Sequence, residues 1–590
     1  MGHMNSLSRF RSCKNISDLA YLVGYQPKTL SYILYKIPDK SKYVEFEIPK
    51  ATKGVRKISA PISELKLVQS RLAHVLQDCL MEIEKEQASG ENCIISHGFK
   101  RHLSISTNGS RHVDKKWVLN FDLKDFFPSI NFGRVRGFFM KNKHFLLEEK
   151  AATIVAQLAC HNNALPQGAP TSPVISNLVA NHLDIRLSRV ATKNRCTYTR
   201  YADDITFSTN KSDFPKGVAA DRNDGSPSGD WELSKKIRSE VKRSGFEVNP
   251  DKTRMLFRRS RQDVTGLVVN TKVNVKRELY KQVRAQLHSF IKDDVCSKKV
   301  KIGGVETEVV VSEAALQGML SHIFWVKGAE FNYRRLNKPT GPQEPGFYRE
   351  YRRFLDYKTF VASPQPVVLC EGVTDNIYIQ CAIKRSKVAR PKLQDAGSSS
   401  GLAIKLFQYP KIGNKLRVPS SVQHLNGGTG DLKQLIYKYK GRTDGLADRG
   451  FISPVILLVD NDQGARDGLW GAVKTASGAK KNVDGTKTFY HVTKNLYVVP
   501  TPKLIGGKDS MIEDFLPSSV VSQVLGGKIF NPDEKTFDKK KHYGKRILAE
   551  KVSKDQASID FASFSAILDV IEEVLDHFSA LPRVHGRVKL

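Results

Sequence analysis

Two adjacent aspartates, Asp203 and Asp204, interrupt a stretch of strand-favouring residues, TYTRYADDITFST (197–209). The Thr, Tyr, Ile and Phe residues on both sides of the pair predict a β-hairpin with the aspartates at its tip. Adjacent like charges repel each other unless a cation lies close to them. Because a lone acidic pair is most simply a solvated turn, its interpretation depends on further carboxylates elsewhere in the chain.

Asp122 is a candidate third carboxylate. It ends an apolar, strand-like run in NFDLKDFFPSI (120–130), and Asp125 follows it. Transfer of a nucleotidyl group needs two divalent ions, one to activate the attacking hydroxyl and one to stabilise the leaving pyrophosphate. Mg²⁺ keeps waters and substrate phosphates among its ligands, so two or three carboxylates from separate strands suffice. Asp122, Asp203 and Asp204 therefore predict a two-metal site.

A second acidic group lies in the C-terminal half of the chain. Glu371 directly follows the apolar run PVVLC, and Asp375 comes soon after it. Asp460 and Asp462 follow the apolar run PVILLV. Side chains two residues apart in extended backbone point to the same side, and open α/β sheets place their sites at the carboxyl ends of strands. One acidic strand end is most simply a helix cap, but two together predict a second metal site.

The composition indicates a polyanionic partner. Among 590 residues there are 94 Lys and Arg against 60 Asp and Glu, a formal net charge of +34, which in a chain of this size favours nucleic acid binding. The eight cysteines show no CxxC pair or zinc-ligand spacing and are interpreted as reduced thiols. No apolar run is long enough to span a bilayer, and no signal peptide opens the chain. We therefore expect a soluble, cytoplasmic protein that does not associate with membranes.

The chain is too long for one hydrophobic core, so several domains are expected. Residues 1–42 comprise the scar-like start MGHMNS and a helical lead-in, and residues 43–270 alternate strands and helices. Residues 271–355 include a basic amphipathic helix, ELYKQVRAQLHSFI, that could be a solvated bundle member or could lie along a duplex. Residues 356–590 contain short, fully apolar runs typical of buried parallel strands in an α/β domain.

Four segments together resemble the successive motifs of a reverse transcriptase palm: NFDLKDFFPSI, LPQGAPTSPVISNL, RYADDITFS and GFEVNPDKTR. The resemblance runs from about Tyr43 to Asn270 and implies an α+β right-hand polymerase with fingers, palm and thumb. It implies that Asp122, Asp203 and Asp204 hold Mg²⁺.

The same resemblance assigns deoxynucleotide contacts. Phe127 would clash with a ribose 2′-hydroxyl, and Gln167 would lie against the nascent base pair. Arg56, with Lys53 near it, would contact the triphosphate, whose oxygens match a planar guanidinium. Lys252 would lie near the pyrophosphate. Outside these motifs, Arg56 and Lys252 would be read as solvated surface charges.

Two further patches resemble the retron branch of reverse transcriptases. VTGLVVN carries Val264, Thr265 and Gly266, and NGSRH carries Asn108 and His112. The retron pattern at the second patch is Asn-Ala-x-x-His, so the glycine after the asparagine departs from it by one methyl group. The resemblance implies that these five residues contact a structured noncoding RNA. It also implies priming from the 2′-hydroxyl of an internal guanosine and a branched, RNA-linked single-stranded DNA product.

The second acidic group resembles a TOPRIM domain, an α/β fold with a mostly parallel sheet. Its pattern is Glu-Gly-x-x-Asp followed by Asp-x-Asp, and the nuclease branch of that fold has a further acid and a lysine similar to Glu513 and Lys545. This resemblance implies Mg²⁺ or Mn²⁺ held by acids of this group, with Glu371 and Lys545 in catalysis. The metal-associated acids would be Glu371, Asp375, Asp460, Asp462 and Glu513.

The whole architecture resembles a retron reverse transcriptase fused to a TOPRIM effector, as in the Ec67 type. That group implies anti-phage defence and possible homo-oligomers. One alternative keeps the polymerase and makes the TOPRIM region a non-catalytic nucleic-acid-binding or assembly module. Another treats the chain as a basic RNA-binding scaffold with an inactive polymerase.

Overall fold

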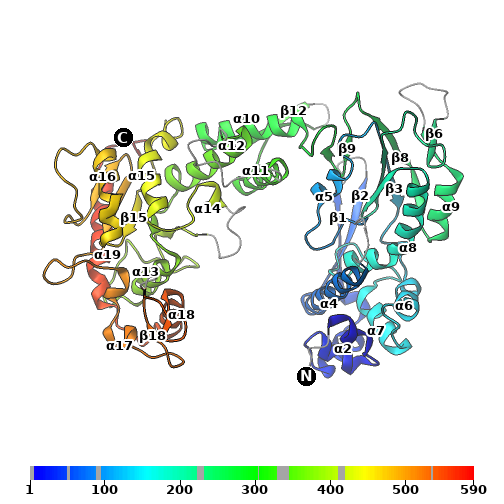
Figure 1. The fold of residues 1–590 in the computed structure, drawn as a ribbon, viewed down its shortest axis with the longest axis horizontal. Helices are drawn as coiled ribbons and strands as arrows, with labels where there is room; N and C mark the ends of the chain where they lie inside the picture. The colour runs from blue at the N-terminus through cyan, green and yellow to red at the C-terminus, as the bar shows by residue number, and fades with distance from the viewer. Residues whose placement is uncertain are drawn as a thin grey trace. The chain divides into compact units, whose positions relative to one another are not determined.

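The structure is a computed structural model that describes residues 5–49, 54–87, 95–221, 231–302, 305–328, 344–409, 419–532 and 536–589. The chain forms two compact units, Met1–Lys276 and Arg277–Leu590 (Figure 1). The boundary lies close to the predicted one at residue 270. The helices that follow it, which the sequence placed in a separate region, cluster with the second unit.

A four-stranded antiparallel sheet organises the first unit. Its strand order is β4-β5-β3-β8, with β4 Thr197–Tyr201, β5 Asp204–Thr209, β3 Trp117–Lys124 and β8 Glu247–Phe257. Phe121 and Phe207 stack at 6.2 Å between ring centroids within the core. Helices α8 (Ser172–Lys193) and α9 (Lys235–Arg243) pack against the edge strands β4 and β8 (Figure 1). The hairpin predicted over residues 197–209 is confirmed as β4 and β5.

Helices and a second hairpin surround this sheet. The hairpin pairs β1 (Tyr43–Pro49) with β2 (Val55–Pro61), and α4 (Ser63–Gln87) follows it. The remaining elements of the unit are α1 Ser6–Arg11, α2 Ile16–Leu22, α3 Pro27–Ser31, η1 Tyr32–Lys36, η2 Asp39–Ser41, α5 Ile105–Ser110, α6 Phe132–Lys141, α7 Glu149–Ala159, β6 Ala219–Asp221, β7 Trp231–Leu233, β9 Asp263–Val264 and β10 Leu267–Val268.

The second unit contains a five-stranded, mostly parallel sheet. Its order is β14-β13-β15-β17-β16, with β14 Lys405–Leu406, β13 Val367–Cys370, β15 Val455–Val459, β17 Leu496–Pro500 and β16 Tyr490–Thr493. Only β16 runs antiparallel to its neighbour. All residues of β13, β15 and β17 are buried, as expected for strands covered on both faces.

Helices cover this sheet. Alternate residues of β13, β15 and β17 pack in one cluster with α15 (Thr429–Thr443) and α16 (Trp470–Ser477), while α19 (Ser565–Ser579) contacts β17. The other elements are α10 Arg277–Asp293, β11 Ser297–Ile302, β12 Val305–Val310, α11 Glu313–Lys327, α12 Gly346–Asp356, η4 Tyr357–Val361, α13 Val373–Arg385, α14 Pro419–Val422, η5 Ala465–Leu469, η6 Ile512–Phe515, α17 Ser518–Val521, β18 Ile529–Phe530, β19 His542–Tyr543, α18 Lys545–Asp555, η7 Ala562–Phe564, β20 Arg583–Val584 and β21 Arg587–Val588.

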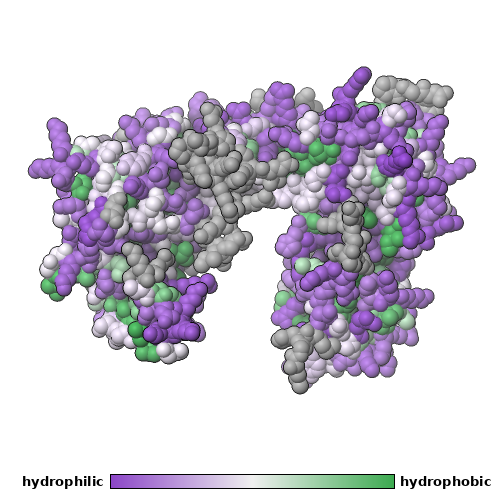
Figure 2. All heavy atoms as spheres, in the orientation of Figure 1, coloured by the Kyte–Doolittle hydropathy of each residue, from purple (hydrophilic) through white to green (hydrophobic). Residues whose placement is uncertain are grey.

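The visible surface of both units is mainly hydrophilic. Figure 2 shows small, separate apolar areas among charged and polar side chains. None of the described helices combines the length and the hydropathy that crossing a bilayer requires.

Candidate functional site

The predicted polymerase carboxylates converge at the tip of the β4–β5 hairpin. Asp122 in β3 lies directly opposite Asp204 in β5, and Asp203 occupies the turn before β5. The backbone N–H of Leu123 donates to the carbonyl oxygen of Asp203 at 3.0 Å, which ties the turn to the neighbouring strand. Strand pairing therefore brings Asp122 together with two adjacent carboxylates that lie about eighty residues later in the sequence.

These carboxylates are crowded and poorly solvated. Burial, together with a hydrogen bond to Asp122 and the charge of that residue, raises the pKa of Asp204 to about 8. Burial also raises the pKa of Asp203, against the opposing effect of Lys252 and Arg56. Carboxyl groups held this close together are all ionised only when a cation offsets the repulsion between their negative charges. The arrangement fits a divalent cation.

Lys252 supplies part of the missing positive charge. Its ammonium group pairs with the Asp122 carboxylate, and Asp122 is 7% exposed. The lysine reaches this position because β8 bulges: Asn249 pairs with Asp122 and Arg254 with Asn120, so the residues between them leave the ladder. In this conformation Lys252 contacts an acid of the site. The pyrophosphate contact expected from the sequence stays a prediction.

A buried ion pair supports the hairpin turn, and the sequence interpretation did not include it. The Arg200 side chain is fully buried and donates to both Asp184 oxygens, from Nε at 2.8 Å and from Nη2 at 2.7 Å. Its Nη1 also donates to the carbonyl oxygen of Ala202 at 3.0 Å. Ala202 has a positive φ of 55°, so this bond holds an unfavourable turn conformation beside Asp203. The sequence signals were an acid among the apolar positions of a helix and a base within a strand.

Gly98 is a second supporting residue that was missed. A Cβ atom at this position would lie 2.6 Å from the backbone nitrogen of Ala202, so only glycine fits. The amide of Asn177 donates to the Gly98 carbonyl oxygen at 2.6 Å and fixes the segment. The turn that carries Asp203 is therefore packed from both sides.

The predicted nucleotide contacts lie around this hairpin. Phe127 is half-buried and packs on Phe99 at 6.0 Å, and Phe99 in turn contacts Tyr201 at the end of β4. Gln167 is joined to β2, because its carbonyl oxygen accepts a 2.8 Å hydrogen bond from the Ser59 N–H. Arg56 is exposed on β2 and close enough to lower the pKa of Asp203. Lys53 lies outside the described residues.

The two patches predicted to contact RNA lie together. Helix α5 and the residues after it pack on the β9–β10 hairpin, where Val264 pairs with Leu267 and is buried, and Thr265 and Gly266 form the turn with φ of 47° and 82°. A Cβ on Gly109 would meet Val269 at 3.4 Å, an ordinary contact. An alanine, as in the retron pattern, would therefore fit here.

The side chains of Asn108 and His112, which the sequence resemblance assigns to RNA contact, are both buried. His112 is 0% exposed and its ring nitrogens each lie 2.7 Å from a hydroxyl oxygen, of Ser208 and of Thr199. Asn108 is 1% exposed. The contact of these two residues with RNA stays a prediction. The two contacts of His112 join the segment after α5 to strands β5 and β4.

The second acidic group also comes together in space. Glu371 and Asp460 follow the adjacent parallel strands β13 and β15, so both lie at the carboxyl edge of the sheet. Burial, followed by the charges of Asp375 and Glu371, raises the pKa of Asp460 to about 8. Glu513 and Lys545 act on the same carboxyl in opposite directions. The acids and the lysine predicted from the sequence thus share one electrostatic environment.

Backbone N–H groups and one hydroxyl orient these acids. Asp375 accepts from Gly372 at 2.7 Å, Asp460 from Ile512 at 2.9 Å and Asp462 from Ala465 at 3.1 Å. The Thr429 hydroxyl donates to Glu371. Thr429 begins α15 directly after the glycine pair 427–428, whose second N–H donates to the Glu371 carbonyl oxygen at 2.8 Å. The sequence interpretation did not include Thr429.

Glu513 and Lys545 form a partly satisfied pair within this group. The ammonium of Lys545 donates to Glu513 Oε2 at 3.2 Å, and Glu513 is 2% exposed. The other oxygen, Oε1, is buried and has no hydrogen-bond partner among the described residues. Burial raises the pKa of Glu513, and the lysine opposes that effect. A buried carboxylate oxygen without a hydrogen-bond donor is suited to bind a cation.

The two acidic groups differ from a preformed metal site. Within the described ranges, no three His, Cys, Asp or Glu side chains have ligand atoms arranged to hold one ion as the structure stands. Like-charge crowding, the Lys252–Asp122 pair and the unpaired Glu513 oxygen make both groups chemically suitable for a divalent cation.

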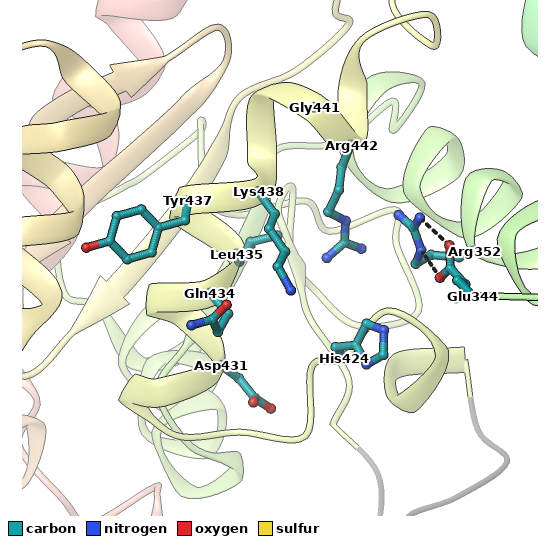
Figure 3. Close-up of a pocket in the computed structure, with 10 residues that line it drawn as sticks. All are labelled: Glu344, Arg352, His424, Asp431, Gln434, Leu435, Tyr437, Lys438, Gly441 and Arg442. Atoms are coloured by element: carbon teal, nitrogen blue, oxygen red, sulfur yellow. Dashed lines mark hydrogen bonds and ion pairs between the residues drawn. The ribbon is translucent and has the colours of Figure 1, made fainter. Parts of the chain in front are cut away.

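A cavity of about 420 Å³ lies elsewhere in the second unit (Figure 3). Residues of α15, with His424 and Arg352, line it, and Tyr437 points away from the others. Arg352 pairs with Glu344 at 2.8 Å, and Arg442 pairs with the buried Asp356. Because its arginines are neutralised and it contains no residue of the acidic group, the cavity is not part of either candidate site.

Comparison with known proteins identifies the first unit. The family model described as reverse transcriptase (RNA-dependent DNA polymerase) matches residues 48–276, and this match ends where the first unit ends. Among solved structures, telomerase from Candida albicans in complex with a fragment of telomeric RNA aligns over 54% of this chain and 59% of that chain. Its identity is 12% and its TM-score 0.30.

Two retron enzymes are similar in sequence. The Mx162 reverse transcriptase of Myxococcus xanthus is 34% identical over 46% of this chain and 58% of its own length. The Ec86 reverse transcriptase of Escherichia coli is 32% identical over 49% of this chain and 80% of its own length. The chain thus spans somewhat more than half of the first relative and most of the second. It belongs to the family of retron reverse transcriptases.

Proposed function

We propose that the first unit is an RNA-directed DNA polymerase. The observation that carries this proposal is the strand register that sets Asp122 opposite Asp204, with Asp203 in the adjoining turn. These three residues would hold Mg²⁺, which when bound supplies activation of the primer hydroxyl and charge stabilisation at the phosphates. Arg56 and the undescribed Lys53 bind the triphosphate, Phe127 excludes the ribose 2′-hydroxyl, and Gln167 supports the new base pair. Lys252 exchanges its Asp122 partner for phosphate.

Primer extension tests this function. The full chain with a primed RNA template, deoxynucleotides and Mg²⁺ should make DNA, and Asp203→Ala should abolish synthesis. Asp213→Asn changes an exposed aspartate outside the site and should leave synthesis unchanged. Failure of the unsubstituted chain to extend the primer would favour the alternative of an RNA-binding scaffold with an inactive polymerase.

The template is proposed to be a structured noncoding RNA, primed from an internal 2′-hydroxyl to give branched RNA-linked single-stranded DNA. Membership of the retron family and the packing of α5 on the β9–β10 hairpin support this proposal. Thr265 and Gly266, which form the turn of that hairpin, are the surface that would meet the RNA. Replacing the priming guanosine by its 2′-deoxy form should abolish synthesis, and extension from that RNA would contradict the proposal.

The second unit is proposed to be a TOPRIM-type phosphodiesterase. Its support is the shared environment of Glu371, Asp375, Asp460 and Glu513 beside Lys545. These acids and Asp462 would hold Mg²⁺ or Mn²⁺, which when bound supplies Lewis-acid activation of the phosphodiester. Lys545 stabilises charge on the cleaved phosphate. Asp460→Ala should abolish metal-dependent cleavage of nucleic acid, whereas Asp448→Asn, at an exposed aspartate, should not. Equal cleavage by the unsubstituted chain, Asp460→Ala and Asp448→Asn would favour the alternative that the TOPRIM region is a non-catalytic nucleic-acid-binding or assembly module.

The two activities together would make an Ec67-type defence system. In this hypothesis the bound RNA–DNA restrains the nuclease, and an invading phage that damages the DNA releases it. Deleting the noncoding RNA should then make the unsubstituted chain more toxic to cells than its Asp460→Ala version. Equal toxicity would contradict the restraint.

A further inference from the structure

The second unit contains a hairpin loop with an unusually exposed apolar tip beside its acidic group. Residues 501–510 leave β17 and return toward η6, and the Leu504 N–H donates to the Lys508 carbonyl oxygen at 3.0 Å. At the tip, Ile505 is 98% exposed. Single exposed apolar residues are common, so exposure alone assigns no role. The position of this loop and its chemistry are what distinguish it.

The base of the loop is fixed to the acidic group itself. The Asn461 N–H donates to the Ser510 carbonyl oxygen at 2.9 Å, and the Ser510 N–H donates back to Asn461 at 3.2 Å. Asn461 lies between Asp460 and Asp462 in the sequence. Five residues of extended chain span at most about 17 Å, so the tip lies within roughly five nucleotide steps of Ser510. A bound strand that runs from the acids along this loop therefore needs no more than about five nucleotide steps to reach Ile505.

The chemistry of the tip suits a nucleic acid. Lys503 and Lys508 flank it and are both exposed, and Gly506 and Gly507 have φ of 80° and 75°. A Cβ added to either glycine would meet nothing within 4 Å, which leaves room for a sugar-phosphate backbone to approach. Isoleucine is among the side chains that proteins insert between base steps. Arg466 and Asp509 pair at 2.6 Å and brace the loop.

We propose that Ile505 is a wedge that inserts between stacked bases of a nucleic acid bound at the acidic group, while Lys503 and Lys508 contact its phosphates. The proposal rests on the proposed phosphodiesterase function. It adds a substrate class, a base-stacked strand with a deformable step, and a positioning residue that holds the scissile phosphodiester over the acids. Flexible pyrimidine–purine steps would be the preferred positions, because they unstack most easily.

The test uses the full chain with two polymers, an RNA hairpin and a DNA duplex, each carrying 2-aminopurine at a pyrimidine–purine step. We expect Ile505→Ala to raise the KM for cleavage about tenfold, the factor that corresponds to losing one base contact. Ile505→Leu should restore cleavage and Ile505→Lys should not, which separates insertion from charge attraction. Val388→Ala, at a 63% exposed residue beyond the far end of α13 from Asp375, is the matched control. Comparing the RNA hairpin with the DNA duplex shows which of the two polymers the chain cleaves.

Two controls separate this inference from the proposed function. Hydrolysis of bis(4-nitrophenyl) phosphate has no bases to contact, so Ile505→Ala should leave it unchanged while Asp460→Ala abolishes it. If nothing is cleaved, the phosphodiesterase proposal fails, and 2-aminopurine fluorescence in EDTA still tests the wedge. A fluorescence increase on binding that Ile505→Ala removes supports insertion. Cleavage and fluorescence with Ile505→Ala equal to those of the unsubstituted chain would overturn it.

Discussion

Both acidic groups hold crowded carboxylates in place, but different parts of the chain support them. Each buries several carboxylates at strand ends, and each raises the pKa of one aspartate, Asp204 or Asp460, to about 8. In the first unit the acids face one another across antiparallel strands, and buried side chains hold their turn. In the second unit they follow parallel strands, and backbone N–H groups hold them individually. The first site should therefore depend more strongly on residues that never touch a substrate.

Removing the buried support of the hairpin should have the largest effect. Arg200→Ala leaves Asp184 as an uncompensated buried charge, which typically costs about 3–5 kcal/mol of unfolding free energy. Polymerase activity should be lost, while peptides of the second unit keep their protection in hydrogen exchange. Arg258→Ala breaks an exposed ion pair with Asp114 and should cost no more than about 1 kcal/mol. Similar losses for the two variants would contradict the role given to Arg200.

Adding one methyl group should have opposite effects on stability at two glycines of the first unit. Gly98→Ala puts a Cβ 2.6 Å from the Ala202 nitrogen, so we expect a loss of about 1–3 kcal/mol and weaker polymerase activity. Gly137 lies within α6 and has open space around it, so Gly137→Ala should stabilise by about 0.5–1 kcal/mol. Chemical unfolding of both variants measures the difference. A stable and active Gly98→Ala would show that the turn is not packed as described.

Relieving like-charge repulsion should stabilise each unit separately in the absence of divalent ions. Asp204→Asn should stabilise the first unit, and Asp460→Asn the second, each by about 0.5–2 kcal/mol at pH 8. A carboxyl with a pKa of about 8 in the folded chain and about 3.9 in the unfolded chain favours folding at low pH. This contribution is lost as the pH rises from about 4 through 8. Hydrogen exchange at pH 5 and pH 8 measures it, and equal effects at both values would contradict the sign.

His112 should give a pH effect on stability that is confined to the first unit. Burial lowers its pKa to about 3, whereas the unfolded chain has a value near 6.5. The unfolded state therefore binds a proton that the folded state does not, and the first unit loses stability as the pH falls below about 6.5. His112→Gln should flatten this slope in the melting temperature between pH 4 and pH 7. His74 is exposed, so His74→Gln should leave the slope unchanged. The same slope in both variants would contradict the role of His112 in the pH dependence.

Local patterns carried the predictions that succeeded. The strand-favouring residues around Asp203 predicted the hairpin, and the fully apolar runs before Glu371 and Asp460 predicted buried parallel strands. Both depend on neighbouring residues alone. The same runs placed the acids at strand ends, so most of the two candidate sites followed from them.

The features that were missed depend on how distant segments pair. Arg200 meets Asp184 only because α8 packs on β4, and Gly98 is required only because its segment crosses the hairpin turn. His112 is a plausible RNA contact in the sequence, yet it is buried because it bridges hydroxyls on β4 and β5. The Lys252 contact with Asp122 follows from a bulge in β8. No periodicity in the sequence encodes these registers.

We propose that this chain makes branched DNA on a bound RNA. The most direct test is to purify the full chain from cells that express the cognate RNA and to treat the attached nucleic acid with nucleases and a debranching enzyme. We predict a DNA whose migration shifts on debranching and which is absent from Asp203→Ala. Recovery of RNA alone, with no DNA from the intact site, would contradict branched DNA synthesis by this chain.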